Sequence, residues 1–76
     1  MDKDKVIELA IRLLGGIEGE LTISFMKEEN AYYISRPIKG GGSVIVANDG
    51  SFLFADSSVG FIKHLEEFKK GRRSNG

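Results

Sequence analysis

Two short apolar segments around a turn sequence constrain the fold of this chain more than any other feature. Residues 43–47 (SVIVA) and 51–55 (SFLFA) are rich in the β-branched and aromatic residues that favour strands. Between them stands Asn48-Asp49-Gly50, which is typical of a tight hairpin. We therefore expect an antiparallel hairpin with a two-residue turn, either Asp49-Gly50 or Asn48-Asp49.

Both faces of this hairpin are apolar. Either two-residue turn divides the side chains into the same two sets, because the residues keep the same alternation. One set is Ile45, Ala47, Phe52 and Phe54, and the other is Val44, Val46, Leu53 and Ala55. Helices on one side of the sheet can cover only one of these sets.

We expect the Phe-containing set to face the core, because its burial removes more apolar surface from water. That choice leaves Val44, Val46 and Leu53 partly exposed, as a patch for self-association or for a partner protein. The alternative is that loops fold over this patch, or that the sheet curls enough to enclose both sets.

Amphipathic helices are predicted at both ends of the chain. Residues 2–14 carry apolar side chains at helical spacing opposite a charged face, and Gly15-Gly16 ends the pattern. A second helix ending at Gly71 is predicted from the helical spacing of Phe61 or Ile62, Leu65 and Phe68. Its candidate N-caps are Asp56, Ser57 and Ser58.

A second hairpin is predicted over residues 21–36, before the glycine run at residues 40–42. Residues 21–25 alternate apolar and polar side chains, so that Leu21, Ile23 and Phe25 are expected to face a core. Residues 27–30 form a polar turn, and residues 31–36 return as a strand that Pro37 ends. Which of Tyr32 and Tyr33 points inward stays open.

These elements predict one small α+β domain over residues 1–76. We expect a helix, a four-strand antiparallel meander and a second helix, in two layers with both helices on one face of the sheet. Residues 72–76 contain no apolar side chain that could hold them in place, so we expect a flexible tail.

Composition narrows the class of protein. The absence of cysteine excludes disulfides, thiolate catalysis and cysteine-based zinc sites. Eleven basic residues balance eleven acidic ones, so no global field favours nucleic acid or an anionic membrane. The mixed-charge start does not match a signal peptide and no apolar run is long enough to span a membrane, so we expect a cytoplasmic protein.

No catalytic, metal-binding or cofactor-binding constellation is predicted, and we do not expect an enzyme. The run Gly40-Gly41-Gly42 precedes a strand rather than a helix, which favours a flexible connection over a phosphate loop. His64 is the only histidine and is expected at the surface. Asp56, Ser57 and Ser58 are interpreted as helix caps rather than as a nucleophile with its acid.

Basic side chains provide an alternative interaction surface. They are Arg36 and Lys39 beside the glycine run, and Lys69, Lys70, Arg72 and Arg73 at the end of the second helix. The C-terminal cations complement the helix dipole. In the alternative interpretation the whole set binds RNA or DNA, with Tyr32 or Tyr33 stacking on bases.

Two families share the predicted order of elements. Double-stranded RNA-binding domains place lysines at the entrance to their second helix, where this chain has Asp56-Ser57-Ser58-Val59-Gly60, so that assignment is disfavoured. Small phage-encoded inhibitors of CRISPR nucleases have a similar outline, although their strongly acidic DNA-mimic type does not match a net charge of zero.

The C-terminal half combines a hairpin with a capped helix, in the segments Tyr32-Tyr33, Pro37-Ile38, Gly42-Ser43-Val44-Ile45-Val46, Asp49-Gly50, Ser57-Ser58 and His64-Leu65-Glu66-Glu67-Phe68. This half resembles small bacterial immunity-type domains of the heat-induced YrhB-like kind. The resemblance implies a protein that neutralises or sequesters another protein.

We therefore expect a non-enzymatic protein-binding module, of the toxin-neutralising immunity type or a phage-derived inhibitor. Its expected partner is another protein or a second copy of the chain, bound through Val44, Val46 and Leu53. A nucleic-acid-binding domain is the alternative, and a membrane partner is not expected.

Overall fold

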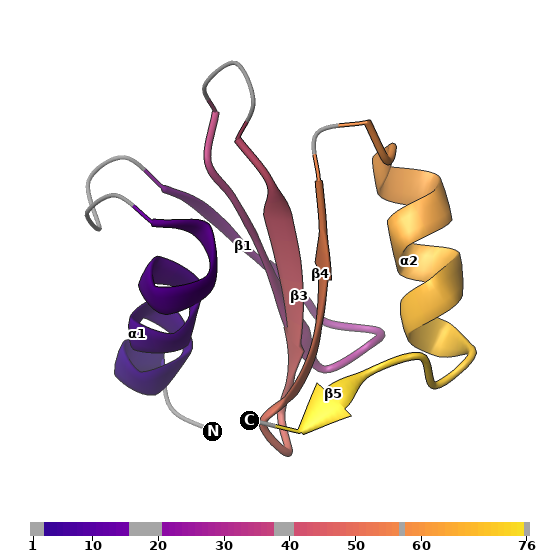
Figure 1. Cartoon of the computed structure of the whole chain (residues 1–76). Helices are drawn as coiled ribbons and strands as arrows, with labels where there is room; N and C mark the ends of the chain where they lie inside the picture. Colours follow the sequence, from indigo (N-terminus) through magenta and orange to yellow (C-terminus); the bar gives the residue numbers. More distant parts are fainter. Residues whose placement is uncertain (1–2, 16–20, 38–40, 57, 76) are drawn as a thin grey trace.

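The computed structural model describes residues 3–15, 21–37, 41–56 and 58–75. These residues form two helices and five strands in the following order (Figure 1): α1 (Lys3–Leu14), β1 (Thr22–Met26), β2 (Ala31–Ser35), β3 (Ser43–Ala47), β4 (Ser51–Ala55), α2 (Phe61–Lys69) and β5 (Ser74–Asn75). The strands form one antiparallel sheet in the order β1-β2-β3-β4-β5. The α+β class and the meander between two helices are therefore confirmed.

The two helices lie on opposite faces of the sheet, where one shared face was expected (Figure 1). The face under α1 holds one core cluster, formed by Val6, Ala10, Leu14, Ile34, Val44 and Val46. The face under α2 holds a second cluster, formed by Ala31, Ile45, Ala47 and Phe68. Helices on both sides give three layers. Each apolar face of the sheet is therefore covered by one helix.

The hairpin between β3 and β4 has a three-residue loop, where a two-residue turn was expected. Val44 pairs with Phe54 and Ile45 pairs with Leu53. Gly50 has a φ of 92° and donates its N–H to the carbonyl of Ala47 at 3.0 Å. This positive φ suits a three-residue loop that ends in a left-handed glycine.

The extra loop residue changes which side chains share a face. Phe52 and Phe54 lie on the α1 side with Val44 and Val46, while Leu53 lies on the α2 side. The predicted exposure of the valines is wrong: Val44 and Val46 are both 0% exposed. Neither can contact a partner unless α1 leaves the sheet.

Part of the segment for which a flexible tail was expected pairs with the sheet. Ser74 and Asn75 form β5 and pair with Phe52 and Ser51 of β4. The Arg73 guanidinium lies 3.9 Å from the ring centroid of Phe68, and its Nε donates to the Phe68 carbonyl at 2.9 Å. A cation held over an aromatic ring supplies the attachment that apolar residues would otherwise give.

Candidate functional site

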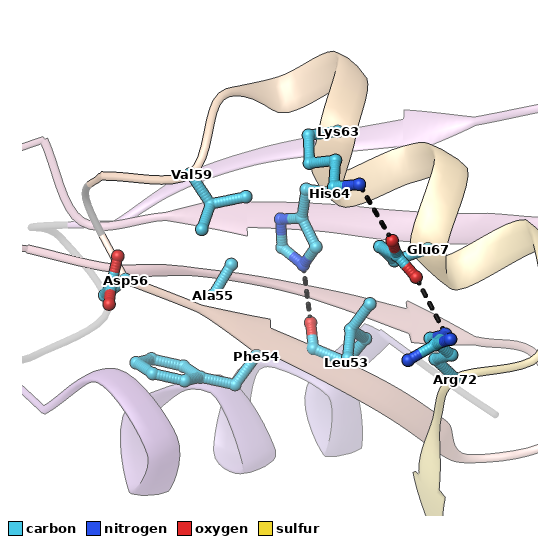
Figure 2. Close-up of a pocket in the computed structure, with 9 residues that line it drawn as sticks. All are labelled: Leu53, Phe54, Ala55, Asp56, Val59, Lys63, His64, Glu67 and Arg72. Atoms are coloured by element: carbon cyan, nitrogen blue, oxygen red, sulfur yellow. Dashed lines mark hydrogen bonds and ion pairs between the residues drawn. The ribbon is translucent and has the colours of Figure 1, made fainter.

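A hollow lies at the edge of the sheet, beside the part of β4 that β5 does not cover. Within the described residues β5 pairs only with Ser51 and Phe52, so residues 53–55 have no strand on their outer side. A hollow of about 420 Å³ opens there between β4 and α2 (Figure 2). Its lining residues are Leu53, Phe54, Ala55, Asp56, Val59, Lys63, His64, Glu67 and Arg72.

The wall on the β4 side is formed by the apolar side chains of Leu53 and Ala55, whereas Phe54 projects its ring to the opposite, α1 side of the strand (Figure 2). Phe54 is 46% exposed although it lies in the middle of a hairpin strand. Its ring packs against Gly42, where an added Cβ would stand 2.8 Å from Phe54 Cε2 and from the Ala55 carbonyl oxygen. The last glycine of the glycine run therefore has a packing function, because only a residue without a side chain fits there.

Three charged side chains line the C-terminal end of the hollow. Glu67 Oε1 lies 3.0 Å from Lys63 Nζ, and Glu67 Oε2 lies 2.9 Å from Arg72 Nε (Figure 2). The hydrogen bond from Lys63 lowers the pKa of Glu67, against the opposing effect of desolvation. The carboxylate pairs with both cations, so that both are already engaged by Glu67 at this end of the hollow.

Asp56 lies at the other end of the hollow, in the segment that connects β4 to α2. Its Oδ1 accepts from the backbone N–H of Ser58 at 2.9 Å and also from the Ser58 hydroxyl, and these bonds lower the pKa of Asp56. The predicted helix capping by Asp56 and Ser58 is wrong, because the N-cap residue is Gly60 and no described side chain caps α2. Ser57 lies outside the described residues.

His64 is buried between α2 and the sheet, where a surface position was expected. It is 1% exposed, with Nε2 2.7 Å from the Leu53 carbonyl oxygen and Nδ1 3.1 Å from Ser43 Oγ. A carbonyl can only accept, so Nε2 carries a proton, and in the neutral ring Nδ1 accepts from the Ser43 hydroxyl. Figure 2 shows the ring reaching from α2 to β4.

The Ser43 and His64 pair has the residue types of a nucleophile and its base. Ser43 is only 7% exposed and does not line the hollow, although His64 does. A substrate in the hollow would therefore not contact the hydroxyl. This geometry fits a buried structural hydrogen bond better than a catalytic pair.

The structure separates the predicted binding residues. Of the predicted patch, Leu53 lines the hollow, whereas Val44 and Val46 lie beneath α1. Phe54, Val59, Lys63 and Glu67 were missed by the sequence interpretation. Phe54 would have been found from the correct loop length, which places it at the margin of the α1 side.

The basic residues do not gather into one surface. Arg36 donates from Nη1 to the Leu14 carbonyl at 3.3 Å, on the α1 side of the sheet. The C-terminal cations follow α2, which covers the opposite side (Figure 1). Arg72 and Arg73 already bind Glu67 and Phe68, while Lys69 and Lys70 are exposed. Lys39 lies outside the described residues.

We also searched the described part of the chain for a metal site and for a membrane-spanning helix. Among the residues described, no group of three or more His, Asp or Glu side chains could hold a metal ion. Neither α1 nor α2 is long and apolar enough to cross a membrane. Comparison of the chain with models of protein families, with curated proteins and with solved structures found no match.

Proposed function

We propose that this chain is a non-enzymatic protein-binding module that receives an extended segment of another protein in the hollow beside β4. The observation that carries this proposal is that residues 53–55 have no partner strand within the described part of the chain. The apolar hollow lies on the α2 side of this edge, and the exposed Phe54 ring lies on its α1 side. An uncovered strand edge offers backbone N–H and C=O groups to an added strand.

The chemistry of the hollow favours an apolar side chain on that segment. Leu53, Ala55 and Val59 supply apolar surface in the hollow. Phe54 supplies an exposed aromatic ring on the α1 side of the same edge, and aromatic side chains are common anchors at protein interfaces. Over the whole lining, the cations Lys63 and Arg72 are matched by the carboxylates Asp56 and Glu67. Such a site suits a neutral, apolar peptide better than a phosphate-rich polymer.

The resemblance to immunity-type domains supports a neutralising function. The likeness covers the hairpin and the second helix, and the same two elements line the hollow. We propose accordingly that the partner is a toxin or another protein that this chain inhibits, as an immunity-type or phage-derived inhibitor would, and that both act in the cytoplasm.

Selection from a random peptide library displayed on phage tests the proposal. The parent should enrich peptides with alternating apolar residues, which should lose binding to a Phe54→Lys variant. Ile62→Lys is the matched control, because Ile62 is 67% exposed on α2 and does not line the hollow. Peptides that bind parent and Phe54→Lys equally well, or no enrichment at all, would contradict the proposal.

Nucleic acid binding is the alternative outcome. Fluorescence anisotropy with random RNA and DNA, at low and high salt, measures it directly, because phosphate contacts weaken as salt rises. Salt-dependent binding that is lost when Lys69 and Lys70 are changed to Glu would replace the present proposal.

A further inference from the structure

Within the described residues, the outer edge of β1 is a second strand edge without a partner strand. In the described residues β1 pairs only with β2, in an uninterrupted register from Thr22 with Ser35 to Met26 with Ala31. The strand TISFM contains no charged residue and no proline. Edge strands are normally protected by lysines, prolines, bulges or covering elements. The described part of the chain shows none of these along β1.

Phe25 marks this edge with exposed apolar surface. The side chain is 52% exposed, and its ring centroid lies 5.0 Å from that of Tyr32 on the neighbouring strand. The core cluster beneath α1 takes its sheet residues from β2 and β3, and Ile23 of β1 packs only at its margin. Phe25 therefore stands on the α1 side, beyond the cover that the helix provides.

We propose that two copies of the chain associate through β1, as antiparallel strands related by a two-fold axis at Ser24. This register uses all five strand residues of each copy. Ile23 then lies opposite Phe25 of the second copy, Thr22 lies opposite Met26, and Ser24 lies opposite itself. Because antiparallel partners project on the same face, apolar side chains meet apolar side chains on the α1 side.

A second copy fits this edge because the strand is complementary to itself. An isologous interface requires one patch to match its own image, which the alternation around Ser24 does. The formal net charge is zero, so no global repulsion opposes the association of two copies. Two five-residue strands make a small interface, so we expect a weak dimer with a dissociation constant of about 10–100 μM.

Cysteine crosslinking tests the register, since the chain contains no cysteine of its own. Directly opposed residues have Cβ atoms close enough for a disulfide. Ser24→Cys should form a covalent dimer under mild oxidation. Thr22→Cys is the matched control and should not, because the register places the two Thr22 residues four positions apart. Equal crosslinking of the two variants, or none with Ser24→Cys, would overturn the proposal.

Analytical ultracentrifugation tests the association itself. The parent should shift from monomer to dimer as its concentration rises through about 10–100 μM. Phe25→Lys should remain monomeric, whereas Ile62→Lys, an equally large change at another exposed site, should behave as the parent. A parent that is monomeric up to about 1 mM, or a Phe25→Lys variant that still dimerises, contradicts the proposal. Crosslinking of Ser24→Cys keeps it testable if Phe25→Lys fails to fold.

Discussion

Nδ1 of His64 lies 3.1 Å from the hydroxyl oxygen of Ser43 and thereby joins α2 to β3. The other ring nitrogen, Nε2, binds the Leu53 carbonyl of β4 at 2.7 Å. One buried side chain thus fixes the second helix against two strands. The same ring forms part of the lining of the hollow beside β4.

Ser43→Ala removes the donor to Nδ1 of His64. A buried acceptor left without its partner costs about 1–3 kcal/mol, so we expect the free energy of unfolding to fall by that amount. Urea denaturation at neutral pH measures it. Ser24→Ala, at an exposed position in β1, should change stability by less than about 0.5 kcal/mol. An equal effect of the two substitutions would show that the histidine does not depend on Ser43.

Gly42→Ala should destabilise the domain and disturb the site, because its Cβ would meet the Ala55 carbonyl and the Phe54 ring at 2.8 Å. Overpacking of this kind costs about 1–3 kcal/mol. Gly60→Ala is the control, since an added Cβ at Gly60 meets no atom within 4 Å. Thermal unfolding compares the two, and a Gly42→Ala variant as stable as Gly60→Ala would contradict the packing of Phe54 on Gly42.

Val46→Lys should unfold the protein, because Val46 is fully buried beneath α1 and a lone buried charge is strongly unfavourable. Far-UV circular dichroism and one-dimensional NMR report the loss of structure. Ile62→Lys introduces the same charge at an exposed site and should leave the fold intact. A folded Val46→Lys variant that has merely lost self-association would restore the original prediction of an exposed valine patch.

The stability of the hairpin should fall in acid. The Ser51 hydroxyl and N–H both donate to Asp49 Oδ1, at 2.6 and 2.9 Å, and this lowers the pKa of Asp49. A pKa lower in the folded state gives stability above the unfolded value, near pH 4, that is lost as the pH falls through the folded value. NMR titration of the carboxyl should show a higher pKa in Ser51→Ala. An unchanged pKa in that variant would contradict this cause.

The types and order of the helices and the four main strands could be predicted from the sequence, because hydrophobic periodicity is a local property. The face assignment could not, because one residue in the loop before Ser51 decides it. With three loop residues, Val44 shares a face with Phe54 and not with Leu53. The loop length thus decides which β4 residues share the face of the valines, whereas the burial of the valines follows from α1 covering that face.

The site depended on contacts that no local pattern encodes. His64 appears as a surface residue in the sequence because its partners, Ser43 and Leu53, lie on strands far along the chain. Arg73 was assigned to a flexible tail because its contact with the Phe68 ring depends on the turn at Gly71, which has a φ of 88°. Both are long side chains whose positions follow from tertiary structure.

The central claim is that the uncovered edge of β4 binds an extended protein segment, and NMR mapping with a selected peptide tests it most directly. Titration of ¹⁵N-labelled protein should move the amide signals of Leu53, Phe54, Ala55 and Val59, and should protect amides of this edge from hydrogen exchange. Signals of β1 should change little. Shifts that concentrate instead on Thr22–Met26, or on Lys69 and Lys70, would contradict the claim.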